Sequence, residues 1–264
     1  MANQETMTPR ERWEAVLKRE TPDRVPMEYW GTAEATNNLL THLGCDWDEA
    51  MRRLHLDQPL SVGGKYIGPE PPAGEDIFGL KRRAIDYGSG TYSEVANAPL
   101  AEYETVEEIE KNYRWPSPDW WDYRGIPDQV RGQDQRLVRG GGSEPFLLYC
   151  QLRGLEQAFM DLVIAPEIVD YCLGKLFDLA YENTRRIFEA IPGKVLFSYV
   201  AEDLGSQQSL LMSREHMQRF LFPHMKRMMD LVHGAGAYVF HHSDGAIREV
   251  IPRSEEHTSE LQSQ

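Results

Sequence analysis

The second half of the chain alternates apolar runs with longer amphipathic segments. Residues 146–151 form an apolar run, which favours a strand buried on both faces. Residues 166–190 repeat apolar side chains at helical spacing, with Ile168, Leu176 and Ile187 on one stripe. Patterns of these two kinds predict strands over 146–151, 194–200 and 237–242, and helices over 154–163, 166–190, 213–233 and 245–251. Strands that alternate with helices are joined by βαβ crossovers, so we expect an α/β fold with a parallel sheet.

The first half is less regular. An opening helix is predicted over 8–19, because Thr8 and Glu11 form a capping box and Pro9 suits the first helical position. Other elements are predicted as a strand over 25–30, helices over 34–43 and 48–54, and a hairpin with arms 83–87 and 91–95. Residues 63–125 are an irregular excursion rich in Pro and Gly. It either packs aromatic side chains over an edge of the core or covers an active site as a lid.

Charge and cysteine content exclude several classes of protein. The chain has 42 acidic and 28 basic side chains and a net charge of −14, which opposes binding to nucleic acid through phosphates. No apolar run approaches the length of a bilayer span, and the polar N-terminus lacks the apolar stretch of a secretory signal. The three cysteines are an odd number at wide spacing and form no disulfide framework. A cytoplasmic protein without a membrane partner is expected.

The last twelve residues differ from everything before them. Residues 253–264 lose all apolar periodicity, and RSEEHTSELQS resembles the conceptual translation of a common sequencing adapter. A disordered polar tail is the simpler alternative. We treat Arg253–Gln264 as a non-native tail and expect the natural protein to continue past Pro252.

Candidate chemistry gathers where two predicted strands end. Glu202 and Asp203 follow the strand over 194–200, while His242 ends the strand over 237–242 and Asp244 comes two residues after it. Ligands of parallel α/β proteins lie at the carboxyl ends of strands, so these side chains are expected to face one pocket. A histidine and a carboxylate two residues apart can ligate one metal ion, and a pocket carboxylate can act as a general base.

Each of these residues has a structural alternative. Asp244 precedes a predicted helix and could simply cap it. His241 should point away from His242, because neighbouring strand residues face opposite sides. The glycines at 140–142 are expected to be a flexible approach to the strand at 146, since no Gly-Lys-Ser/Thr sequence follows as in a phosphate-binding loop.

Four segments together resemble the uroporphyrinogen decarboxylase superfamily, in particular its divergent branch related to corrinoid-dependent methyltransferases. They are MTPRERWEAVLKRETPDRVPMEYW (7–30), GEDIFGLKRRAIDY (74–87), EDLGSQQSLL (202–211) and HSDGAIREVIP (242–252). The resemblance implies a (β/α)8 TIM-type barrel. Since the regular part has too few strands, residues 1–252 are expected to be an incomplete barrel that lacks about three βα units, on the order of 90 residues.

The methyltransferase branch has a zinc site that begins His-x-Cys where this chain has His242-Ser243-Asp244. The resemblance therefore implies His242 and Asp244 as metal ligands, with Asp244 as a harder substitute for the thiolate. Asp203 matches the Asp-Leu-Gly motif and is expected to contact substrate or orient a site histidine, with Glu202 beside it as a polar wall. The implied activity is methyl transfer between a small molecule and a corrinoid cofactor on a partner protein.

Two other functions stay open at this point. One is decarboxylation of uroporphyrinogen in porphyrin biosynthesis, as the superfamily name suggests. Its enzymes carry an arginine-rich motif where this chain has Pro26–Gly31, which contains no arginine. The porphyrinogen, which carries many carboxylates, would then have to bind in an acidic site without these arginines. The other is a non-catalytic barrel that binds a corrinoid or a partner protein.

Overall fold

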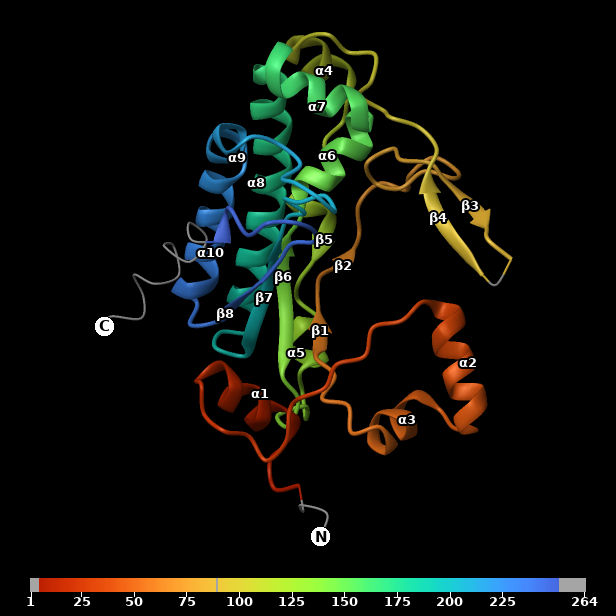
Figure 1. Cartoon of the computed structure of the whole chain (residues 1–264), viewed down its shortest axis with the longest axis vertical. Coiled ribbons are helices and arrows are strands. Elements are labelled where there is room, and N and C mark those ends of the chain that lie inside the picture. The colour runs from red at the N-terminus through yellow and green to blue at the C-terminus, as the bar shows by residue number, and fades with distance from the viewer. Residues whose placement is uncertain (1–4, 89, 252–264) are drawn as a thin grey trace.

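The computed structural model describes residues 5–88 and 90–251 of the chain. A four-stranded parallel sheet lies at the centre of the fold (Figure 1). The strand order is β1-β6-β7-β8, and every neighbouring pair is parallel. The strands are β1 (Leu60–Val62), β6 (Val138–Ser143), β7 (Val195–Ala201) and β8 (Tyr238–His242). The predicted mixed α/β fold with a parallel sheet is confirmed. The predicted non-native tail, residues 253–264, lies outside the described residues.

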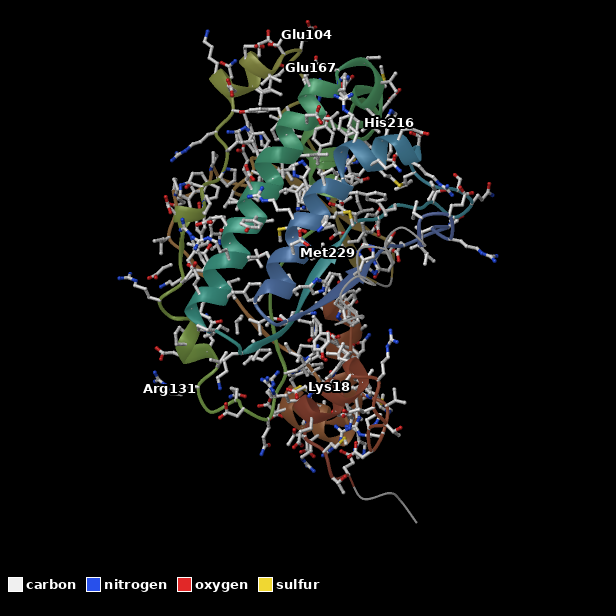
Figure 2. All side chains as sticks on the ribbon, turned by 90° about the vertical axis from the view of Figure 1, so that its left-hand side faces the viewer. Lys18, Glu104, Arg131, Glu167, His216 and Met229 are labelled. Carbon is white, nitrogen blue, oxygen red and sulfur yellow. The ribbon has the colours of Figure 1, made fainter. Side chains whose placement is uncertain are left out.

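Two long helices, α8 (Pro166–Ala190) and α10 (Phe222–Gly234), lie side by side and cover one face of the sheet (Figure 2). The predicted stripe of α8 is buried, with Ile168, Leu176 and Ile187 at most 5% exposed. The helix predicted over 213–233 is divided into α9 (Arg214–Phe220) and α10, because Pro223 near the start of α10 cannot continue the backbone hydrogen bonds of α9. In the described part of the chain, no helix is long and apolar enough to cross a membrane.

The prediction for residues 138–153 was wrong in two linked ways. The apolar run over 146–151 is a helix, α6 (Pro145–Arg153), which begins with Pro145 in its first turn. The predicted flexible glycines belong instead to β6, the strand between β1 and β7. A Cβ atom on Gly142 would lie 2.1 Å from the carbonyl oxygen of Tyr199, so only glycine allows β7 to approach this closely. Helix α7 (Leu155–Ile164) follows α6, close to the prediction.

The N-terminal segment packs below the sheet and begins as predicted. The capping box of Thr8 and Glu11 opens α1 (Pro9–Leu17). The strand predicted over 25–30 is absent from the described structure. Instead, the backbone N–H of Met27 donates to Asp57 Oδ2, and that of Tyr29 donates to Gln58 Oε1, each at 3.0 Å. Side chains thus take the hydrogen bonds that a strand ladder would use.

Residues 33–53 and the predicted hairpin project away from the sheet on the side opposite α8 (Figure 1). The predicted hairpin is confirmed as antiparallel β3 (Arg82–Asp86) and β4 (Thr91–Val95). Its neighbours in sequence are α2 (Ala33–Leu43), α3 (Trp47–Arg53), β2 (Lys65–Tyr66), α4 (Val106–Asn112), the 3-10 helix η1 (Pro118–Trp120), β5 (Trp121–Asp122) and α5 (Ile126–Gln129). After β8, residues 245–250 form bends and turns, so the helix predicted over 245–251 does not begin at 245.

Candidate functional site

The ends of β7 and β8 bring the predicted residues together. The register pairs Ala201 with His242, and the backbone N–H of Glu202 donates to the His242 carbonyl at 3.1 Å. Asp203 and Asp244 follow on neighbouring loops at the carboxyl edge of the sheet. The sequence therefore placed both strand ends at the correct edge.

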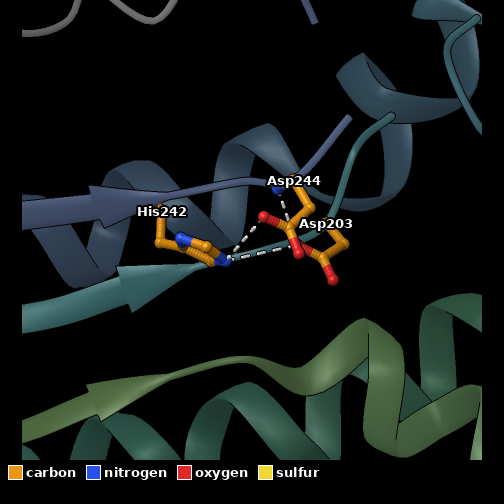
Figure 3. Close-up of side chains that lie close together, drawn as sticks. All are labelled: Asp203, His242 and Asp244. Carbon is orange, nitrogen blue, oxygen red and sulfur yellow. Dashed lines mark hydrogen bonds and ion pairs between the residues drawn. The ribbon is translucent and has the colours of Figure 1, made fainter. Parts of the chain in front are cut away.

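Asp203, His242 and Asp244 form a compact triad (Figure 3). His242 Nε2 lies 3.6 Å from Asp203 Oδ1 and 3.6 Å from Asp244 Oδ1. The side chains of His242 and Asp203 are about one-third exposed, and that of Asp244 is 78% exposed. The triad is thus open to solvent and to a ligand on one side.

Close contact between the two loops fixes this geometry. Leu204 N–H donates to Ser243 Oγ at 2.9 Å, and Ala246 N–H donates to the Ser206 carbonyl at 2.8 Å. Gly245 has a positive φ of 85°, and a Cβ atom there would lie 2.3 Å from the Gly205 carbonyl oxygen. Glycine at 245 therefore permits both the turn and the close approach. Asp244 caps no helix within the described residues.

Glu202 does not line the triad. Its carboxylate is fully buried and accepts the backbone N–H of Phe146 at 3.1 and 3.2 Å, at the first turn of α6. Burial raises the pKa of Glu202 well above the ordinary value of a glutamate. His241 also points elsewhere, with Nδ1 at 2.7 Å from the Val200 carbonyl oxygen. The alternation of side chains along β7 and β8 explains both positions.

Sequence reasoning missed Glu144, which follows β6 at the same edge. Burial raises the pKa of Glu144, and the carboxylates of Asp203 and Asp244 raise it further. The signal was present, since an acidic residue follows a strand here as it does after β7. It was overlooked because the strand was predicted to begin after Glu144 instead of ending before it.

Aromatic side chains beside the triad were also missed. The rings of Tyr199 and His242 are stacked with centroids 5.9 Å apart, and the centroids of Trp30 and Tyr199 lie 6.2 Å apart. Glu28 and Arg139 form an ion pair at 3.3 Å next to Trp30. These residues come from β6, β7, β8 and the segment 28–30, which the sequence treated separately.

The donor atoms of the triad fit a divalent ion such as zinc. One ligand atom from each residue lies within 4.8 Å of the other two. Ligand atoms bound to zinc at 2.0–2.1 Å with tetrahedral angles lie about 3.3 Å apart, close to the two observed separations of 3.6 Å. Imidazole nitrogen and carboxylate oxygen are both zinc ligands, and three protein ligands leave a fourth position for substrate.

Comparison with known proteins gives a match among solved structures. No protein-family model and no curated protein matches this chain. Among solved structures, a methyltransferase from Methanosarcina mazei matches with a TM-score of 0.55 and 17% sequence identity, over 96% of this chain and 74% of that chain. At this identity the match establishes a likeness of fold. The chain is therefore similar in fold to a methyltransferase.

Proposed function

We propose that this protein transfers a methyl group between a small thiol and a corrinoid carried by a partner protein. The observation that carries the proposal is the Asp203–His242–Asp244 triad, a set of zinc-compatible donors at the carboxyl edge of the sheet. The methyltransferase-like fold supports it. We also infer that the parallel sheet is part of a (β/α)8 barrel, in which ligands bind at this edge.

In this proposal His242 and Asp244 hold zinc, and Asp203 completes the set and orients the loop of Asp244. A bound zinc ion supplies positive charge that lowers the pKa of a thiol. Carboxylates donate less charge to a metal than thiolates do, so this donor set leaves more positive charge for that purpose. The exposed face of Asp244 leaves room for the thiol to approach.

The proposed step is balanced without an oxidant or reductant. The thiol releases its proton to solvent through the open side of the triad. Its sulfur forms a new bond to the methyl carbon, and the electron pair of the broken cobalt–carbon bond stays with the corrinoid. The products are a methyl thioether, a proton and the reduced corrinoid. The triad residues orient the thiol and undergo no covalent change.

The acidic side chains beside the triad disfavour decarboxylation of a porphyrinogen. Glu144, Asp203 and Asp244 share this edge of the sheet, and Arg139 is already paired with Glu28. A substrate with many carboxylates would meet repulsion here, because its charges need several arginines or lysines as partners.

The proposal is tested by titrating the metal-free protein with zinc against a chromophoric chelator and then assaying methyl transfer from methylcobalamin to a thiol. His242→Ala should weaken zinc binding at least about tenfold and abolish transfer. His42→Ala, on the exposed face of α2, serves as the matched control and should change neither.

Unchanged zinc affinity and unchanged transfer in His242→Ala would overturn the proposal. Zinc binding without transfer to any thiol would also count against it, and would favour a non-catalytic barrel if the corrinoid protein still bound.

A further inference from the structure

A row of aromatic rings leads away from the triad along the carboxyl edge of the sheet. The Tyr199 ring neighbours both His242 and Trp30, with centroids 5.9 and 6.2 Å away, and it stacks on Phe240 at 5.8 Å. Trp30 is 67% exposed, which is unusual for so large an apolar side chain. The row thus offers aromatic faces to a molecule that also reaches the triad.

The exposed indole is held in place by polar contacts. Trp30 Nε1 donates to Glu28 Oε1 at 3.1 Å, and Arg139 anchors Glu28 through an ion pair at 3.3 Å. Arg139 also donates to Ser61 Oγ at 2.9 Å, which ties the group to β1. A side chain held this firmly loses little conformational freedom when a ligand binds against it.

The surroundings of the row are negatively charged. Arg139 offsets Glu28, which leaves the carboxylates of Glu144, Asp203 and Asp244. A divalent ion at the triad offsets only two of these three charges. Burial is the largest cause that raises the pKa of Tyr199, and the nearby carboxylates of Glu144 and Glu28 raise it further. Aromatic faces beside carboxylates are the chemistry that recognises an organic cation.

We propose that the small molecule that meets the triad carries a positively charged nitrogen, best a quaternary ammonium. The ammonium group contacts the exposed indole of Trp30 where it adjoins Tyr199, and the other end of the molecule points toward His242. The statement that this other end is a thiol rests on the proposed function. The cation site itself rests only on the aromatic row and on the carboxylates of Glu144, Asp203 and Asp244, which we call the acidic wall.

The cation site is tested on the metal-free protein by calorimetric titration with choline and with 3,3-dimethyl-1-butanol, its uncharged isostere. Choline should bind about tenfold more tightly. Trp30→Leu and Tyr199→Leu should each remove this preference, and Tyr92→Leu, an exposed tyrosine on the β3–β4 hairpin, should leave it intact. Equal binding of the two compounds to the unaltered protein would overturn the proposal.

A second variant keeps the test sound if an aromatic substitution prevents folding. Glu144→Gln leaves the aromatic row unchanged and removes one charge of the wall. It should weaken choline binding and leave the uncharged isostere unaffected. If Glu144→Gln bound choline as tightly as the unaltered protein, the acidic wall would have no part in recognition, and the proposal as stated would be wrong.

A series of three thiols separates this inference from the proposed function. With zinc and methylcobalamin present, thiocholine should accept the methyl group with a lower KM than 2-mercaptoethanol, and 2-mercaptoethanesulfonate should be the poorest acceptor. Transfer with the anionic thiol preferred would refute the cation site and support the methyltransferase. A choline preference without transfer to any thiol would refute the methyltransferase and support the cation site.

Discussion

The carboxylate of Asp203 accepts a hydrogen bond from the backbone N–H of Asp244, with 2.8 Å between Oδ1 and the nitrogen. One carboxylate therefore lies within reach of His242 and also fixes the loop that carries the third member of the triad. Charge and hydrogen-bond acceptance at Asp203 have separate consequences, and substitutions can distinguish them.

Asp203→Asn retains the oxygen that accepts from Asp244 but removes the negative charge. We expect zinc affinity to fall about 10–100-fold in Asp203→Asn and further in Asp203→Ala, which also frees the loop. Chelator competition measures both. Asp48→Asn, on the exposed surface of α3, is the control and should bind zinc normally. Normal affinity in Asp203→Asn would show that its charge has no part in metal binding.

Glu202 is expected to make stability depend on pH. Its folded-state pKa is raised by burial, so its stabilising contribution is present below the unfolded pKa near 4.5 and is lost as the pH rises toward the folded value. Glu202→Gln keeps an acceptor for Phe146 N–H and carries no charge. It should stabilise the fold at pH 7.5 by about 1–3 kcal/mol and flatten the rise of Tm toward lower pH. A variant that melts like the unaltered protein at every pH between 5 and 8 would contradict this account.

Residues 138–153 show where sequence reasoning reached its limit. A six-residue apolar run fits a buried strand and a buried helix equally well, because periodicity needs a longer window. Pro145 was the deciding signal, since proline is favoured in the first turn of a helix and lacks the N–H that a central strand uses. The glycines of β6 gave no strand signal, because the need for glycine comes from β7 and α8, which are distant in sequence.

The candidate site was predicted in part for a similar reason. Asp203, His242 and Asp244 come together because two parallel strands end side by side, which topology alone implies. Glu202 could not be separated from Asp203 by type, and strand alternation places it on the buried side. Trp30 was missed because the segment 25–30 is held beside the sheet by the Asp57 and Gln58 side chains, a contact that no local pattern encodes.

Gly142 offers a test of the close contact between β6 and β7. Gly142→Ala introduces a Cβ atom 2.1 Å from the Tyr199 carbonyl oxygen at a φ of 124°, and we expect a loss of about 2–4 kcal/mol in stability. Gly88→Ala has a similar positive φ of 90° with no atom within 4 Å, so it isolates the backbone strain of about 1 kcal/mol. Gly174→Ala, inside α8 with open space around it, should stabilise the fold by about 0.5–1 kcal/mol. Denaturant unfolding of the three variants measures this order, and equal losses in Gly142→Ala and Gly88→Ala would remove the steric argument.

A buried ion pair between Arg12 and Asp57 fastens the N-terminal segment below the sheet. Both side chains are at most 1% exposed, and Asp57 also accepts from Arg24 and from the backbone N–H of Met27. Asp57→Ala leaves the buried Arg12 guanidinium with Asp23 as its remaining ion-pair partner, which should cost about 1.5–3 kcal/mol. Because the two groups share one interaction, Arg12→Ala combined with Asp57→Ala should lose less than the sum of the single losses.

Arg10→Ala is the control for this prediction. It removes only a part-exposed i,i+4 pair with Glu14 and should change stability by about 0.5 kcal/mol or less. Strict additivity in the double variant would mean that the two residues act independently, and that the segment is held by its apolar contacts through Trp13 instead.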